Sequence, residues 1–288
     1  MNEAKKHDEK TEKLIEELKK RSARPCYKIT IDEERKPEIT DSKFGGVPYW
    51  DVQEPYPTDS KGNLMALLVQ INLEKANVAE PLPQKGILQV FLSIDESFLF
   101  GLDRDSEGRQ SNFKVVWHES IKDVDYDAIK ALEMPIMTEE NYSPVNGEYA
   151  INIMPGTSYI TENDINYGAL LADVAKTLFN DPVDPEMPWD YLQGETSDYV
   201  NEQLAGSSPH HQLLGNPCFE QGDPRGGRNK KRQNELLLQI DSDCLRSEER
   251  DYIERIMWGD LGTASFFINS EDLANHDFSD VLYAWECG

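Results

Sequence analysis

The sequence predicts an α+β protein made of two related β-rich halves with pseudo-twofold symmetry. Strand-like apolar segments occur in two regions, helical patterns are confined to the N-terminus and the middle, and the two β-rich regions share ordered sequence matches. The expected organisation is an N-terminal amphipathic helix at 1–24, a first β-rich repeat at 25–160, a helical connector at 161–206 and a second repeat at 207–288. Both repeats are expected to lie in one domain.

The first predicted element is a helix over residues 3–21. Leu14, Ile15 and Leu18 form a narrow apolar stripe in this charged segment, and Pro25 follows it. Acidic residues precede basic ones by four positions, which supports a helix. We expect this helix to lie on the surface of the main body, with a partner-binding helix as the alternative.

Three segments beyond residue 27 have the pattern of strands. Residues 64–71 and 86–94 are almost continuously apolar, as expected for strands covered on both faces, whereas apolar and polar residues alternate in 113–118. Glycine, proline, asparagine and aspartate between them are typical of turns.

The middle of the chain has helical spacing. Apolar residues recur at helical intervals over 165–179, and a shorter helix is expected at 197–204, closed by Gly206. The proline-rich stretch 182–188 between them is typical of a rigid connector.

Three ordered matches indicate an internal duplication. The matched segments are 46–50 with 215–219, 67–72 (LLVQIN) with 236–241 (LLLQID), and 86–92 with 262–268. The first two pairs are both 169 residues apart. Pairing two related sheets would bury an apolar face of each, and a cleft between them is a common ligand location.

Gln70 and Gln239 occupy equivalent positions in this duplication. An amide within an apolar strand must find hydrogen-bond partners, so each glutamine is expected to bond across the join or to a loop backbone. The functional alternative is a pair of amides that lines a symmetric ligand pocket.

Charge narrows the classes of partner. The chain has 54 acidic and 29 basic residues and a formal net charge of -25, which repels nucleic-acid phosphates and anionic bilayers. No apolar run approaches the roughly 18 residues that span a membrane, and the N-terminus has no signal-peptide pattern. We therefore expect a cytoplasmic protein with no nucleic-acid or membrane partner.

The 4 cysteines are scattered, without a CxxC pair or zinc-type spacing, which predicts reduced thiols and no cofactor. Catalytic cysteine chemistry needs a base nearby. Only Cys218 has histidines, His210 and His211, close in the sequence. This pairing alone is a weak signal.

Six motifs carry a family resemblance: 42–49 (SKFGGVPY), 67–72 (LLVQIN), 83–89 (PQKGILQ), 237–243 (LLQIDSD), 257–260 (MWGD) and 278–283 (FSDVLY). In combination they resemble the YwqG-like family of uncharacterised bacterial proteins, over nearly everything from about residue 27 to the end. The resemblance implies a soluble α+β fold and no established activity.

Two segments depart from the family pattern. The family's His-x-x-Gly-Gly-Tyr-Pro pattern stands here as 211–217 (HQLLGNP), with the first glycine replaced. Residues 245–256 are interpreted as an inserted helix capped by Ser247, which would reshape a ligand site near 258–260. His211 and Trp258 are therefore candidate ligand-binding residues.

Asp241, Asp243 and Asp260 are candidate metal ligands. An Asp-x-Asp at a strand end places both carboxylates on one face, and Asp260 is expected to return beside them, as Ca²⁺ or Mg²⁺ would require. The alternative is that these are solvated turn or cap aspartates.

Asp223 and Arg225 form a second candidate site. Either Arg225 binds an anionic ligand, or the two residues form an ion pair within an Asx-Pro turn. Residues 225–232 are a basic island, expected to be a hairpin loop rather than a nucleic-acid patch, since it lacks interleaved aromatics.

No nucleophile elbow, phosphate-binding loop or HExxH motif occurs in the sequence, which favours a non-enzymatic protein without excluding an enzyme. The leading hypothesis is an interaction module whose acidic surface binds a basic protein partner, as immunity proteins do with basic toxins. The alternative is a small-ligand or divalent-metal-dependent enzyme with its site between the two repeats.

Overall fold

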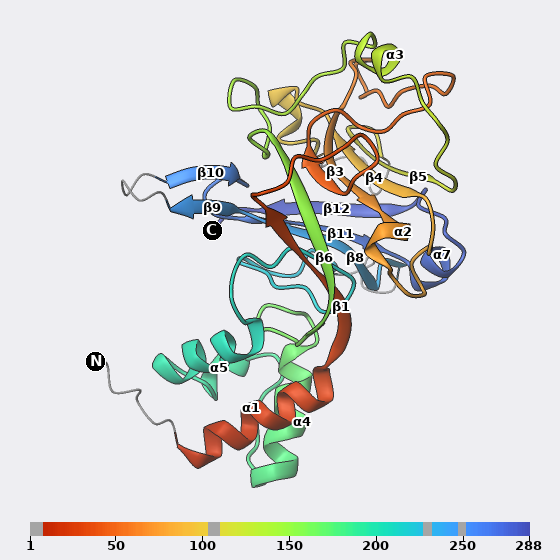
Figure 1. Ribbon diagram of the computed structural model, residues 1–288. Coiled ribbons are helices and arrows are strands. Elements are labelled where there is room, and N and C mark those ends of the chain that lie inside the picture. The colour runs from red at the N-terminus through yellow and green to blue at the C-terminus, as the bar shows by residue number, and fades with distance from the viewer. Residues whose placement is uncertain (1–7, 103–109, 227–231, 247–251) are drawn as a thin grey trace.

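The computed structural model describes residues 8–102, 110–226, 232–246 and 252–288, and its main feature is a ten-stranded antiparallel sheet (Figure 1). The strand order is β12-β11-β8-β7-β1-β6-β2-β3-β4-β5. The strands are β1 (Arg24–Asp32), β2 (Lys43–Gly45), β3 (Ala66–Asn72), β4 (Ile87–Leu92), β5 (Phe113–His118), β6 (Glu148–Ser158), β7 (Gln212–Leu213), β8 (Glu235–Asp241), β11 (Thr263–Ile268) and β12 (Val281–Glu286).

Three helices form a separate group at one end of the sheet (Figure 1). They are α1 (Glu9–Ser22), α4 (Tyr167–Phe179) and α5 (Glu195–Ala205), which confirm, within the described residues, the helices predicted at 3–21, 165–179 and 197–204. The stripe Leu14, Ile15 and Leu18 is buried against α4 and α5 residues. The shorter helices are α2 (Leu73–Ala76), α3 (Tyr126–Lys130), α7 (Ser270–Ala274), η1 (Glu96–Phe98) and η2 (Pro188–Asp190). No helix in the described ranges is long and apolar enough to cross a bilayer.

The predicted α+β fold of two duplicated halves is wrong. The structure is mostly β, and ten of its strands form one continuous sheet that curls into a nearly closed barrel, instead of two sheets that cover each other. The reason lies in β1 and β6, which pair along 9 residues, from Arg24↔Ser158 to Asp32↔Ala150, at the middle of the sheet. This pairing joins the strands of both regions through backbone hydrogen bonds.

The main core lies inside the curled sheet. The end strands β5 and β12 approach each other, since the rings of Phe113 and Tyr283 lie 5.1 Å apart. The Tyr283 hydroxyl donates to the carbonyl of Phe100 at 2.8 Å. Buried side chains from both arms of the sheet, including Leu68, Leu238 and Phe113, form one apolar cluster.

The inserted helix predicted over residues 245–256 is also wrong. Strands β9 (Asp243–Arg246) and β10 (Tyr252–Ile256) form a two-stranded antiparallel sheet here, and Ser247 lies outside the described residues. The neighbouring loop holds β10 extended, because the carbonyl of Arg255 accepts from the amide of Asn146 and Val145 bridges Ile256.

The two buried glutamines fasten loops to strands. Gln70 Oε1 accepts from the amide of Tyr49 at 2.8 Å, and Gln70 Nε2 donates to the carbonyls of Ile39 and Asp41, both at 2.8 Å. In β8, Gln239 bonds the amide and the carbonyl of Cys218 at 2.9 and 3.1 Å. These contacts agree with the predicted bonding to loop backbone.

Replacing Gln70 by leucine is expected to destabilise the fold. The buried amide of Tyr49 and two carbonyls would lose their partner, and leaving such groups unsatisfied costs about 1–3 kcal/mol each, so we expect a loss of roughly 3 kcal/mol. Urea unfolding at neutral pH measures it. The control Gln53→Leu changes an exposed glutamine and should alter the free energy of unfolding by less than about 0.5 kcal/mol. Equal stability of the two variants would contradict the fastening role.

Candidate functional site

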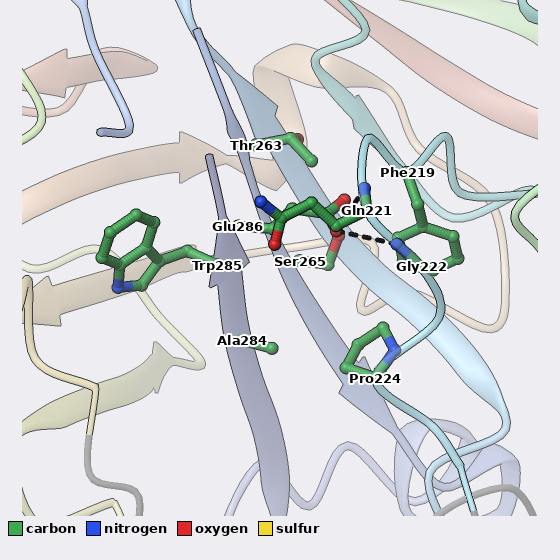
Figure 2. A pocket seen from close by; sticks show the side chains of 9 residues that line it. All are labelled: Phe219, Gln221, Gly222, Pro224, Thr263, Ser265, Ala284, Trp285 and Glu286. Atoms are coloured by element: carbon green, nitrogen blue, oxygen red, sulfur yellow. Dashed lines mark hydrogen bonds between the residues drawn. The ribbon is translucent and has the colours of Figure 1, made fainter. Parts of the chain in front are cut away.

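A cavity of about 300 Å³ lies against strands β11 and β12 (Figure 2). We call it the β11–β12 pocket. Its lining residues are Phe219, Gln221, Gly222, Pro224, Thr263, Ser265, Ala284, Trp285 and Glu286. The lining therefore comes from two neighbouring strands and from the loop that follows β7.

Strand alternation places the pocket on the face of the sheet opposite the main core. Thr263 pairs with Glu286 and Ser265 with Ala284, so these four side chains share one face. The intervening Ala264 belongs to the core. Loop 219–224 lies over this outer face and forms one wall of the pocket.

Glu286 holds this loop against the sheet. Its Oε1 accepts from the amide of Glu220 at 2.7 Å, and its Oε2 accepts from the amides of Gln221 and Gly222 at 2.9 and 3.1 Å. Figure 2 marks the bonds from Gln221 and Gly222. Successive backbone amides form a concave anion site, here filled by the protein's own carboxylate. A carboxylate has about four acceptor positions, so the three bonds leave room for one more donor.

Ser265 contributes a buried hydroxyl without a partner. The residue is 3% exposed, it lines the pocket, and its Oγ makes no hydrogen bond within the described part of the chain. A buried hydroxyl that lacks a partner is costly, and a ligand with a polar group would satisfy it.

The pocket has acidic surroundings. Glu286 is the one ionisable side chain among its lining residues. Next to it, the pKa of Glu220 is raised, first by burial and then by the charges of Asp241 and Glu286. The negative charges of Asp241 and Glu286, which contribute to raising the pKa of Glu220, also create a negative potential that favours a cationic ligand group.

Two of the three candidate metal ligands are buried, and each is paired with a cation. Asp241 accepts from the amide and the ring Nδ1 of His210 at 2.7 and 3.0 Å. Asp243 lies 2.5 Å from a guanidinium nitrogen of Arg255. Asp260 is exposed, and the described residues contain no group of three or more His, Cys, Asp or Glu side chains placed to hold a metal ion.

His211 and Trp258 lie in the protein interior. His211 Nδ1 accepts from the amide of Asp241 at 3.0 Å, so its Nε2 carries the proton and donates to Asp243 at 3.4 Å. Trp258 is fully buried among core aromatics, and its Nε1 has no hydrogen-bond partner in the described ranges. Neither residue lines the β11–β12 pocket.

The buried side chain of Arg225 links the loop after β7 to the segment before α4 and to β11. Its guanidinium contacts Asp223 at 2.5 Å and Asp164 at 2.9 Å, and it stacks 4.8 Å from the centre of the Phe267 ring. These two carboxylates satisfy it, as the ion-pair interpretation of Asp223 and Arg225 expects. Within the basic island, residues 227–231 lie outside the described residues.

A second cavity, of about 570 Å³, lies beside β5 and was not predicted from the sequence. Tyr49, Trp50 and Tyr56 line it, and the Tyr56 hydroxyl is buried without a partner in the described chain. His118 Nε2 donates to Gln89 Oε1 at 2.9 Å. Burial lowers the pKa of His118 to about 4. The cluster of aromatic residues within 49–56 is the sequence feature from which this cavity could have been predicted.

His118 should make the folded state sensitive to mild acid. Because its folded pKa of about 4 is below the ordinary value of about 6.5, the unfolded chain takes up a proton first as the pH falls. The stabilising contribution is complete above about pH 6.5 and is lost as the pH falls towards 4. Urea unfolding of wild type and His118→Gln between pH 8 and 5 measures this effect. The advantage of the wild type should shrink below pH 6.5, and parallel curves throughout would contradict the assignment.

We compared the sequence of this chain with family models and with curated proteins. A search of curated proteins finds no match. The profile of a domain of unknown function, DUF1963, matches residues 42–287, a range that contains both cavities and all strands except β1. Since this match covers most of the sequence, the chain belongs to the DUF1963 family of domains of unknown function.

Proposed function

We propose that this DUF1963 protein is a non-enzymatic cytoplasmic interaction protein that binds a basic protein partner. In this proposal the β11–β12 pocket accepts one lysine or arginine side chain of the partner. On the six sequence motifs, we also assign the chain to the YwqG-like members of the family. The observation that carries the proposal is an acidic pocket with a buried free hydroxyl in a chain of net charge -25.

The pocket chemistry suits a cationic side chain. Glu286 has an acceptor position left, Ser265 offers an unpaired hydroxyl, and no basic side chain lines the cavity to compete. The ring of Phe219 and Pro224 supply apolar walls for the methylene part of a lysine or arginine.

The net charge would act at longer range. A strongly acidic protein attracts a basic partner before contact and raises the association rate, and salt weakens this effect. A basic toxin neutralised by an acidic immunity protein is one relationship of this kind.

The metal-dependent alternative loses support from the geometry. Asp241 and Asp243 are bonded to His210 and Arg255, and Asp260 does not complete a metal-binding group with them in the described residues. We therefore retain the interaction hypothesis.

A pair of peptides tests the pocket. Two basic peptides of about ten residues, identical except for arginine or uncharged citrulline at one central position, are titrated calorimetrically into the full chain at low and moderate salt. We expect the arginine peptide to bind about tenfold more tightly, which corresponds to about 1.4 kcal/mol. Added salt should weaken both complexes.

A pocket-filling variant provides the decisive comparison. Ala284→Trp fills the cavity without changing the net charge and should remove the preference for arginine. Glu80→Gln, at an exposed site outside the pocket, removes one charge and should leave that preference within about twofold. If Ala284→Trp discriminates arginine from citrulline as the wild type does, the pocket is not the binding site.

A further inference from the structure

We propose that the cavity beside β5 binds a small neutral aromatic molecule whose N–H or O–H group donates a hydrogen bond to His118 Nδ1. We call this cavity, lined by residues within 49–58 and 114–122, the β5 pocket. The inference is independent of the proposed partner binding, because no residue lines both this pocket and the β11–β12 pocket.

Strand alternation places the β5 pocket on the outer face of the sheet. Phe113 and Val115 belong to the main core, so Val116 and His118 face outwards and line the pocket. Residues within 49–58 form the opposite wall. The volume of about 570 Å³ is within the range of pockets that hold small molecules.

A buried glutamine fixes the tautomer of the His118 ring. Gln89 is 0% exposed, and its Nε2 donates to the carbonyl of Tyr49 and to Gln70 Oε1, both at 2.8 Å. Because a backbone carbonyl can only accept, this contact identifies the nitrogen end of the Gln89 amide. Gln89 Oε1 therefore accepts from His118 Nε2 at 2.9 Å, and the proton of the neutral ring is on Nε2.

His118 Nδ1 is consequently an acceptor with a free lone pair. Within the described residues no group donates a hydrogen bond to it, and it is not fully buried, so it is accessible on a ring that lines the pocket. Burial of the ring lowers the pKa of His118 to about 4, so the lone pair is unprotonated at neutral pH. An N–H or O–H group of a ligand would satisfy this acceptor.

Aromatic rings form the wall beside this acceptor. The Trp50 ring stands edge-to-face with the rings of His118 and Tyr56, with centroids 5.0 and 5.1 Å apart, and the Tyr49 ring lies 5.2 Å from His118. Trp50 is 3% exposed and Tyr49 is 1% exposed, so packing holds both rings in place. Rigid aromatic walls favour a ligand with a flat apolar body.

The charged groups of the lining give little net attraction for an ion. Asp51 pairs with Lys122 at 3.0 Å, and Glu119 pairs with Lys85 at 3.0 Å. The other two charged side chains of the lining have opposite signs. Because His118 is also neutral, a charged ligand would lose its water without gaining a charged partner. The pocket therefore suits a neutral ligand.

Two ligands of the same shape test the hydrogen bond. Indole has an N–H donor, and benzofuran has an oxygen in its place. Each is titrated at neutral pH into the isotope-labelled full chain, and the NMR shifts of backbone amides report both affinity and location. We expect indole to bind about tenfold more tightly, with shifts centred on 49–58 and 114–122. Equal affinities, shifts centred elsewhere, or no binding of indole up to its solubility limit would overturn the proposal.

Variants distinguish the hydrogen bond from general apolar binding. His118→Gln keeps a donor for Gln89 and removes the imidazole nitrogen, so the preference for indole should fall to less than about twofold. Val116→Trp fills the pocket and should weaken both ligands at least about tenfold. The control Leu178→Trp adds the same ring at an exposed position of α4 and should leave both affinities within about twofold.

A persistent preference for indole in folded His118→Gln contradicts the assigned acceptor. If that variant does not fold, the ratio of the two ligands on the wild type still decides. N-acetyltryptophanamide separates a free ligand from the side chain of a partner, since it carries the indole ring on a peptide backbone. We expect it to bind more weakly than indole, because its peptide groups would lose water at the aromatic walls. Tighter binding would contradict the small-molecule assignment.

Discussion

The long antiparallel pairing of β1 with β6 is the interaction on which the rest of the fold depends. Both strands are central, and the sheet continues from them in two directions through very short strands, β2 on one side and β7 on the other. Strands of two or three residues have too few hydrogen bonds to form a sheet alone. The nine-residue ladder provides the fixed edge for each of them. The positions of β8, β11 and β12, and hence of the β11–β12 pocket, follow from that edge.

Polar side chains then fix the loop that closes the pocket. Gln239 bonds the backbone of Cys218, Glu286 bonds the amides of 220–222, and Arg225 bonds Asp164 near the start of α4. Three attachments within eight residues leave this loop little freedom. A wall that is ordered before binding reduces the entropy lost on binding, which would favour the proposed recognition of one preferred side chain.

Local sequence patterns correctly predicted those helices and strands whose conformation is determined by neighbouring residues in the sequence. The continuous apolar runs became β3 and β4, and the stripe of Leu14, Ile15 and Leu18 became a packed helix face. Strand β6 contains Pro155 and Gly156, which weaken a strand pattern, so its pairing with β1 had no clear local signal. Segment 245–256 fitted a helix by charge and spacing, but the extended form of 252–256 depends on pairing with β9 and on contacts with 144–146. Nothing in the sequence indicated that Ser265 and Glu286 line a pocket. Their positions there depend on the β11–β12 register and on loop 219–224.

The buried cations are paired with carboxylates, and this pairing determines where the excess negative charge of the chain acts. Buried Lys43 pairs with Glu148, and buried Arg225 pairs with Asp164 and Asp223. The Lys43–Glu148 pair is neutral at a distance, and Arg225 with its two aspartates leaves one net negative charge, so most of the acidic excess acts as a diffuse surface field. That field is screened over about 8–10 Å at moderate salt and discriminates poorly among basic molecules. Under the proposed function, selectivity for one basic partner would require a shaped site, and the fixed carboxylate of Glu286 and the Ser265 hydroxyl would supply it in the β11–β12 pocket.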